Sequence, residues 1–173
     1  MNRAMVFLVL GVLGCHAESG GAKAGGDVPK AEPTKVAEPG LASSADVANA
    51  YGEAVAKGDV AAGLRLFPPD EVIDKLFTCK AGPSPAKAEM HKQRDALAKM
   101  IPEMSKLIVA QKWTPKHVGS GKSETQPKGP SGDCTLNEDL PTKEEFVTFH
   151  PDERATIATA QMGGRWYLVH APG

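Results

Sequence analysis

The sequence lacks the long apolar runs of membrane-spanning proteins and the basic runs of nucleic-acid-binding proteins. Only 5% of its 173 residues are aromatic, three are cysteine, and the formal net charge at pH 7 is −1. Beyond the amino terminus no long apolar run occurs, so we expect no membrane-spanning helix, which needs about 20 apolar residues. No sustained basic run occurs either, so we expect no nucleic-acid partner and no charge-driven binding to anionic lipid.

The first 15 residues have the layout of an export signal. Arg3 and the α-amino group supply positive charge, and an apolar run that ends at Leu13 follows them. These are the n-region and the h-region of a secretory signal peptide. The segment Val12–Cys15, with the sequence Val-Leu-Gly-Cys, resembles the lipobox of bacterial lipoproteins. This resemblance implies cleavage after Gly14 and a diacylglycerol thioether on Cys15.

A lipid on Cys15 would anchor the mature chain to a membrane outside the cytoplasm. Each buried methylene contributes about 0.8 kcal/mol, so the two or three palmitate-like chains of a lipoprotein cysteine give stable anchoring. In enteric bacteria an Asp after that cysteine favours the inner membrane, so His16 favours the outer membrane. The alternatives are an ordinary secretory signal with Cys15 present by chance, and an uncleaved anchor.

The composition divides the chain into three parts. Residues 1–14 are the expected signal peptide, and residues 15–45 are rich in Gly, Ala and Pro, with interleaved Lys and Glu and no aromatic residue. Such a segment buries too little apolar surface to fold, so we expect a lipidated, disordered tether. Residues 46–173 are long enough for one α+β globular domain with a single core.

The domain is expected to begin with helices. Ser43 and Asp46 have capping-box spacing, and apolar residues then recur with helical period as far as Lys57. Asp59 can cap a second, short helix, and the segment 68–71, with the sequence Pro-Pro-Asp-Glu, starts a third.

A longer helix is predicted from about Ser84 to Lys112. Its apolar residues keep one phase across Pro102, which favours a kinked helix over two separate ones. The stripe includes Met90, Met100 and Met104, which suit either core packing or an adaptable binding surface.

After Trp113 the residue pattern is typical of strands. We predict a strand over 113–118, a Gly/Pro/Ser-rich loop over 119–132 and extended chain over 134–140. Better strand candidates are 145–150 and a final hairpin, with arms at 154–162 and 165–170 joined by Gly163-Gly164. Helices followed by antiparallel strands predict an α+β fold.

Both ends of the domain carry a family resemblance. The segment 51–59, Tyr-Gly-Glu-Ala-Val-Ala-Lys-Gly-Asp, with Leu66-Phe67, and the segment 163–169, Gly-Gly-Arg-Trp-Tyr-Leu-Val, resemble the nuclear transport factor two-like, cystatin-like roll. The resemblance implies a sheet that curls around helices. Enzymes of that family use an Asp or Tyr inside an apolar cavity, but Tyr51 and Asp59 match structural positions only, so no catalytic residue is assigned.

Cys79 and Cys134 are the two cysteines that remain once Cys15 is lipidated. In an oxidising compartment two thiols are expected to pair, which would join the helical half to the strand half. The alternatives are two buried free thiols or a redox pair, although a redox pair usually has Cys-x-x-Cys spacing.

No other pattern in the sequence indicates a catalytic, phosphate-binding or metal-binding site. The segment Gly119–Ser123 resembles the end of a phosphate-binding loop, but the first Gly of that motif is missing, which favours a flexible loop. The acid pairs Asp70-Glu71 and Glu144-Glu145 read as solvated residues at helix starts or turns. The histidines lack metal-ligand spacing, so we expect no metal and no cofactor; they are His91, His117, His150 and His170.

The sequence therefore predicts a non-enzymatic envelope lipoprotein that binds a protein or a small apolar ligand. The alternative is a roll-type enzyme or ligand carrier with a cavity between helices and sheet. That alternative requires an acidic or Tyr side chain in an apolar cavity with a shifted pKa. His170, which alternates with Trp166 and Leu168, was expected on the face that such a cavity would use.

Overall fold

The computed structural model describes residues 40–150 and 153–172. Cys15 and the predicted signal peptide therefore lie outside the described residues. The elements of the described chain are α1 (Ser44–Lys57), α2 (Val60–Leu64), α3 (Asp70–Leu76), β1 (Phe77–Cys79), α4 (Pro85–Gln111), β2 (Lys116–Gln126), β3 (Gly129–Ser131), β4 (Cys134–Leu136), β5 (Leu140–His150), β6 (Glu153–Met162) and β7 (Arg165–His170). The order of helices and then antiparallel strands confirms the predicted α+β class.

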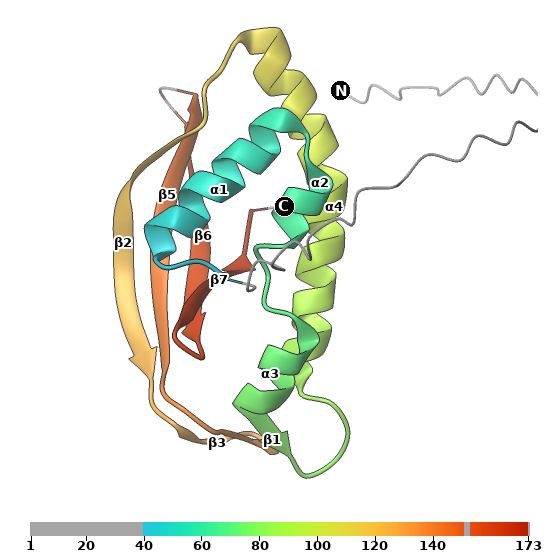
Figure 1. The fold of residues 1–173 in the computed structure, drawn as a ribbon, viewed down its shortest axis with the longest axis vertical. Helices are drawn as coiled ribbons and strands as arrows, with labels where there is room; N and C mark the ends of the chain where they lie inside the picture. The colour runs from blue at the N-terminus through green and yellow to red at the C-terminus, as the bar shows by residue number, and fades with distance from the viewer. Residues whose placement is uncertain (1–39, 151–152, 173) are drawn as a thin grey trace, which may run out of the picture. The chain divides into compact units, whose positions relative to one another are not determined.

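The strands form two antiparallel sheets. The larger sheet has the strand order β2-β5-β6-β7, and the smaller sheet has the order β1-β4-β3. Helix α1 crosses the larger sheet, and the long helix α4 contacts each of the other three helices (Figure 1). None of the helices formed by the described residues combines the length and the hydropathy that crossing a bilayer requires.

Helix α1 forms where its capping signals predict. The Ser43 hydroxyl accepts a hydrogen bond from the Asp46 backbone N–H at 3.1 Å, which satisfies one of the free donors of the first turn. Gly58 ends the helix with φ of 68°, a left-handed conformation that glycine adopts without strain. The Asp59 carboxylate then caps α2 by accepting from the Ala62 N–H at 2.8 Å.

Helix α4 is a single helix that includes Pro102, as predicted. It is capped by the Ser84 hydroxyl at its start and ends at Lys112 in a left-handed conformation. Met100 and Met104 are half-buried and pack against the core. Gly63 of α2 lies against this helix, and a Cβ at that position would overlap the side chain of Ile101.

Two apolar clusters hold the domain together. The main cluster lies between the helices and the larger sheet, and its members with 0% exposure are Val47, Ala48, Val55, Ile101, Val147, Ile157 and Leu168. The second cluster includes Leu76 of α3, Leu136 of β4 and Tyr167 of β7. It packs the smaller sheet and α3 against β5, β6 and β7 of the larger sheet.

The β6–β7 hairpin turns at Gly163-Gly164, as predicted. Their φ angles are 55° and 78°, and positive φ at both central residues matches the tight turns that suit the twist of a hairpin. Tyr167 and Leu168 of β7 are both buried, whereas His170, at the end of the strand, is exposed. His170 is not among the described residues that line the cavity beside the helices.

The expected loop over 119–132 is also wrong. Residues up to Gln126 belong to β2, and 129–131 form β3. Strand β2 is an edge strand that pairs with β5 through two register shifts, and most of its side chains are exposed. An exposed, Gly- and Ser-rich edge strand lacks the alternation of a half-buried strand, so its pairing with β5 determines its structure and its local sequence does not. Its segment Gly119–Ser123 is therefore part of a strand.

The folded region includes residues that the sequence placed in the tether. Leu41 pairs with Trp166 through two backbone hydrogen bonds of 2.9 Å, which extends the sheet beyond β7. Ser44, the first residue of α1, is buried. The part of the chain that packs on the sheet thus begins before residue 46.

Candidate functional site

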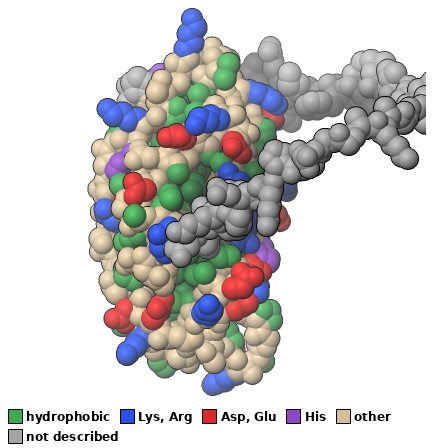
Figure 2. Space-filling view, in the orientation of Figure 1, with side chains coloured by type: hydrophobic (Ala, Val, Ile, Leu, Met, Phe, Trp, Pro, Cys, Tyr) green, Lys and Arg blue, Asp and Glu red, His purple; other side chains and the backbone are tan. Residues whose placement is uncertain are grey.

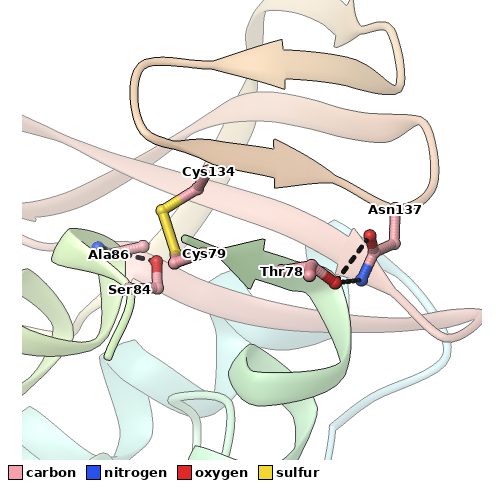
Figure 3. The surroundings of a disulfide bond; sticks show 6 residues. All are labelled: Thr78, Cys79, Ser84, Ala86, Cys134 and Asn137. Carbon is pink, nitrogen blue, oxygen red and sulfur yellow. Dashed lines mark hydrogen bonds between the residues drawn. A yellow bond between two sulfur atoms is a disulfide. The ribbon is translucent and has the colours of Figure 1, made fainter. Parts of the chain in front are cut away.

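Cys79 and Cys134 form a disulfide, with the two sulfurs 2.01 Å apart. They lie opposite each other in β1 and β4. Beside them the Asn137 amide donates to the Thr78 hydroxyl at 3.1 Å (Figure 3). The bond spans 55 positions and joins the helical half of the chain to the strand half. These contacts give the disulfide a structural position, at the junction of the smaller sheet with α3 and α4.

Glu145 on β5 is a fully buried charged residue, with 0% exposure. Its carboxylate accepts hydrogen bonds from the hydroxyls of Ser44 at 2.6 Å and Ser120 at 2.7 Å. It also lies 2.7 Å from His117 Nε2 and 3.1 Å from Lys143 Nζ. Glu145 therefore joins the first turn of α1 to β2 and β5, and the expectation that it is a solvated turn residue is wrong.

The surroundings of Glu145 make it a poor catalytic base. Burial alone would raise its pKa, but the hydrogen bonds from Ser44, Ser120, His117 and Lys143 outweigh burial and hold the pKa below the ordinary 4.5. A general base works best with a pKa near the operating pH. The Ser120 hydroxyl donates to the carboxylate, so its proton is held there. The geometry favours a structural role for this cluster.

A second charged cluster links α3 to α4 at the surface. Asp70, the first residue of α3, lies 2.9 Å from His91, 3.1 Å from Arg94 and 3.3 Å from Lys87. The hydrogen bond from His91, with those from Lys87 and Arg94, lowers the pKa of Asp70 to about 2 against the opposing effect of burial. Asp70 therefore starts a helix, as predicted, and also fastens that helix to α4.

The predicted histidines are dispersed over the fold. His91 bonds to Asp70 and His117 to Glu145, while the His150 ring packs 5.3 Å from the Trp113 ring. His170 is exposed at the end of β7. Within residues 40–150 and 153–172, no group of three or more His, Cys, Asp and Glu side chains is placed to hold a metal ion.

Tyr51 occupies the centre of the buried stripe of α1. It is 1% exposed, and its ring meets the Phe149 ring edge-on, with centroids 6.1 Å apart. Its hydroxyl forms no hydrogen bond with any described residue. Burial raises the pKa of Tyr51 far above its ordinary value of 10, so the phenol is a neutral donor at physiological pH.

A cavity of about 500 Å³ lies against Tyr51. Helix α4 contributes Met100 and Met104 to its lining, β5 contributes Phe149, and β6 contributes Ala155. Arg154 of β6 is the charged residue of the described lining, which contains no carboxylate and no imidazole. The methionine stripe of α4 thus serves both interpretations, because the same side chains pack against the core and border the cavity.

Sequence reasoning placed Tyr51 on the inner face of α1 but gave it no role beyond packing. The signal that could have indicated one is the phenol itself, since a buried Tyr usually finds a hydrogen-bond partner for its hydroxyl. Whether a partner exists depends on residues from α4 and β5 that are distant in sequence. The missing partner is therefore visible only in the fold.

The fold and this cavity define an α+β domain with an apolar hollow bordered by α1, α4 and the larger sheet. No family model matches the chain, and no curated protein matches it. Among solved structures it is similar to a calcium/calmodulin-dependent protein kinase type II association domain from Thiobacillus denitrificans. The two share 15% identity over 78% of this chain and 97% of that one, with a TM-score of 0.40. A similarity of this size assigns neither a partner nor an activity.

Proposed function

We propose that this chain is a lipid-anchored envelope protein whose domain binds a small apolar ligand bearing a hydrogen-bond acceptor. The observation that carries the proposal is Tyr51, a buried residue that lines a cavity of about 500 Å³ and whose hydroxyl forms no hydrogen bond with a described residue. The anchor is supported by the lipobox-like segment Val12–Cys15. The preference of His16 for the outer membrane is part of the same proposal.

The chemistry of the hydroxyl supports a ligand at Tyr51. The fully buried side-chain polar atoms that lack a partner in the described chain are Arg94 Nε and Arg165 Nε, so the Tyr51 oxygen keeps some accessible surface and can donate to a molecule in the cavity. A ketone, ester or ether oxygen placed against Tyr51 would accept that hydrogen bond, worth about 1 kcal/mol. The rest of the ligand would rest on Met100, Met104 and Phe149, side chains that supply apolar and polarisable contacts.

The lining supports binding rather than turnover. Acid–base chemistry needs two groups of different proton affinity within reach of the substrate. The described lining offers one neutral phenol and the guanidinium of Arg154, which stays protonated, and no carboxylate or imidazole. A carrier or sensor of a neutral ligand fits this set of residues better than an enzyme does.

Binding is best tested with matched ligand pairs. The full-length chain carrying Cys15→Ser is titrated with acetophenone and with ethylbenzene, and with larger cyclic ketones and their carbonyl-free analogues, by ligand-observed NMR. Tyr51→Phe should weaken ketone binding by about five- to tenfold, the worth of one hydrogen bond of 1–1.5 kcal/mol, and leave the hydrocarbons unchanged.

Tyr167→Phe is the matched control, because it removes a hydroxyl from the other apolar cluster. It should leave both ligand types unchanged. Ketones that bind no better than their hydrocarbon analogues, or that bind Tyr51→Phe as tightly as the parent chain, would contradict the proposal.

The anchor is tested by mass spectrometry of the chain purified from membranes. We expect an amino-terminal Cys15 carrying two or three acyl chains, and a Cys15→Ser chain without lipid. An unmodified thiol at Cys15 in the membrane-derived chain would contradict the lipoprotein assignment.

A further inference from the structure

A second hollow, separate from the Tyr51 cavity, lies where the described chain begins. This entry groove has a volume of about 430 Å³ and is bordered by Gly40 and Leu41, by α1 and α2, and by α4. Leu41, Leu64 and Phe67 form part of its apolar wall. Hydrophobic side chains gather over the helices on the face shown in Figure 2, with charged side chains around them. Sites for small molecules commonly have about this volume.

The entry groove is lined by two arginines, and its described lining holds no acid. Arg65, at the end of α2, is exposed and makes no ion pair with the residues that the structure describes. Arg94 donates from Nη1 to Asp70 at 3.1 Å and from Nη2 to the Pro68 carbonyl oxygen. Its Nε is buried and has no acceptor among the described residues. Positive charge therefore remains at this groove, and Arg65 supplies the donors that a ligand could reach.

Asp70 does not neutralise this charge. Its single carboxylate is shared among Arg94, Lys87 and His91 at 3.1, 3.3 and 2.9 Å. Asp74, one turn further along α3, forms an ion pair with Lys87 at 2.8 Å. An anion that approached Arg65 and Arg94 would thus meet cations that the protein's own acids leave incompletely paired.

The groove lies where the described chain begins. Arg165 donates to the Gly40 carbonyl oxygen at 2.7 Å, and Leu41 is held to Trp166 by two backbone hydrogen bonds. Cys15 precedes Gly40 by 25 positions in the sequence. Lipidation of Cys15 would therefore tether the groove to a membrane through a short stretch of chain.

We propose that the entry groove binds an anionic single-chain amphiphile, with the acyl chain against Leu41, Leu64 and Phe67 and the carboxylate against Arg65 and Arg94. The planar guanidinium group matches a carboxylate in geometry as well as in charge. The site is independent of Tyr51. Only the membrane as the source of the amphiphile rests on the proposed anchor.

The test separates the acyl chain from the charge. The full-length chain carrying Cys15→Ser is titrated with laurate below its micellar concentration and followed by native mass spectrometry and calorimetry. Dodecyl maltoside has the same chain with a neutral head, and butyrate and inorganic phosphate supply an anion without the chain. We expect saturable binding of laurate at one site and at least tenfold weaker binding of the other three, since both halves of the ligand contribute.

Arg65→Gln is the decisive variant, because this exposed side chain supports no described contact of the fold. It should weaken laurate binding by about tenfold, the effect of losing one charge-assisted hydrogen bond. Lys106→Gln, an exposed cation of α4 that lines neither cavity, is the matched control and should change nothing. Ala62→Trp should block the groove, with folding checked by circular dichroism.

The outcomes are distinguishable from those of the Tyr51 cavity. Tyr51→Phe should leave laurate binding unchanged, and Arg65→Gln should leave ketone binding unchanged. Equal binding of laurate and dodecyl maltoside, equal binding by Arg65→Gln and the parent chain, or phosphate binding as tight as laurate binding would each overturn the proposal.

Discussion

Glu145 and Tyr51 are both buried in the domain, but their hydrogen bonding differs. Glu145 is surrounded by Ser44, Ser120, His117 and Lys143. The hydroxyl of Tyr51 has no described partner, although its ring is as deeply buried. A buried polar group that its neighbours satisfy helps to specify the fold, whereas a hydroxyl without a described partner beside a cavity is free to bond a ligand.

The difference also separates the two groups in their chemistry. The donors around Glu145 stabilise its charged form and lower its pKa, while burial without a partner keeps Tyr51 neutral. One group is a fixed charge that fastens α1 to the sheet. The other is a neutral donor that faces apolar side chains.

The largest expected effect comes from removing the satisfied group. Glu145→Ala should lower the free energy of unfolding by about 3–5 kcal/mol, because it leaves Lys143, His117 and two serine hydroxyls without their acceptor. Urea unfolding followed by circular dichroism measures this loss. Glu145→Gln keeps the shape of the side chain and should lose less. A loss under about 1 kcal/mol for Glu145→Ala would show that the cluster is not structural.

The second prediction concerns the disulfide, and its effect on stability can be compared with that of Glu145→Ala. Replacing Cys79 and Cys134 together by Ser should lower the free energy of unfolding by about 2–4 kcal/mol, since a loop of 55 positions is released. Ketone binding at Tyr51 should persist in this variant at temperatures where it is folded. Loss of ketone binding by the folded double variant would show that the smaller sheet helps to shape the Tyr51 cavity.

Acid should weaken the protein through Glu145 and Asp70. Both have pKa values below their ordinary ones in the folded state. Their stabilisation is therefore complete above about pH 4.5 and is lost as the pH falls through the folded-state values, which for Asp70 is about 2. Urea unfolding at pH 6, 4 and 3 should show the difference between the parent chain and Glu145→Gln shrinking as the pH falls. A difference that grows toward acid would contradict the lowered pKa of Glu145.

The elements that could be predicted from sequence are those with local signals. Ser43, Gly58 and Asp59 mark the ends of α1 and α2 through contacts within a few residues. The turn at Gly163-Gly164 is likewise determined by the conformational freedom of two adjacent glycines. In these places the sequence pattern and the final contacts involve the same residues.

The features that could not be predicted depend on distant pairs. Strand β2 exists because β5 pairs with it, and its exposed Gly- and Ser-rich sequence has no strand pattern of its own. Glu145 reads as a solvated acid until Ser44, 101 positions earlier, is placed beside it. The Tyr51 cavity requires side chains from α1, α4 and two strands, so the candidate site was not visible in one dimension.

The smallest expected effect tests the comparison most directly. The free energies of unfolding of Tyr51→Phe and Glu145→Gln are measured side by side in urea, without added ligand. Tyr51→Phe should be as stable as the parent chain or more stable, because the variant loses only an unpaired hydroxyl. Glu145→Gln should be less stable in the same measurement. A loss of more than about 1 kcal/mol for Tyr51→Phe would show that its hydroxyl is already satisfied in the folded protein, and would remove the basis for a ligand at Tyr51.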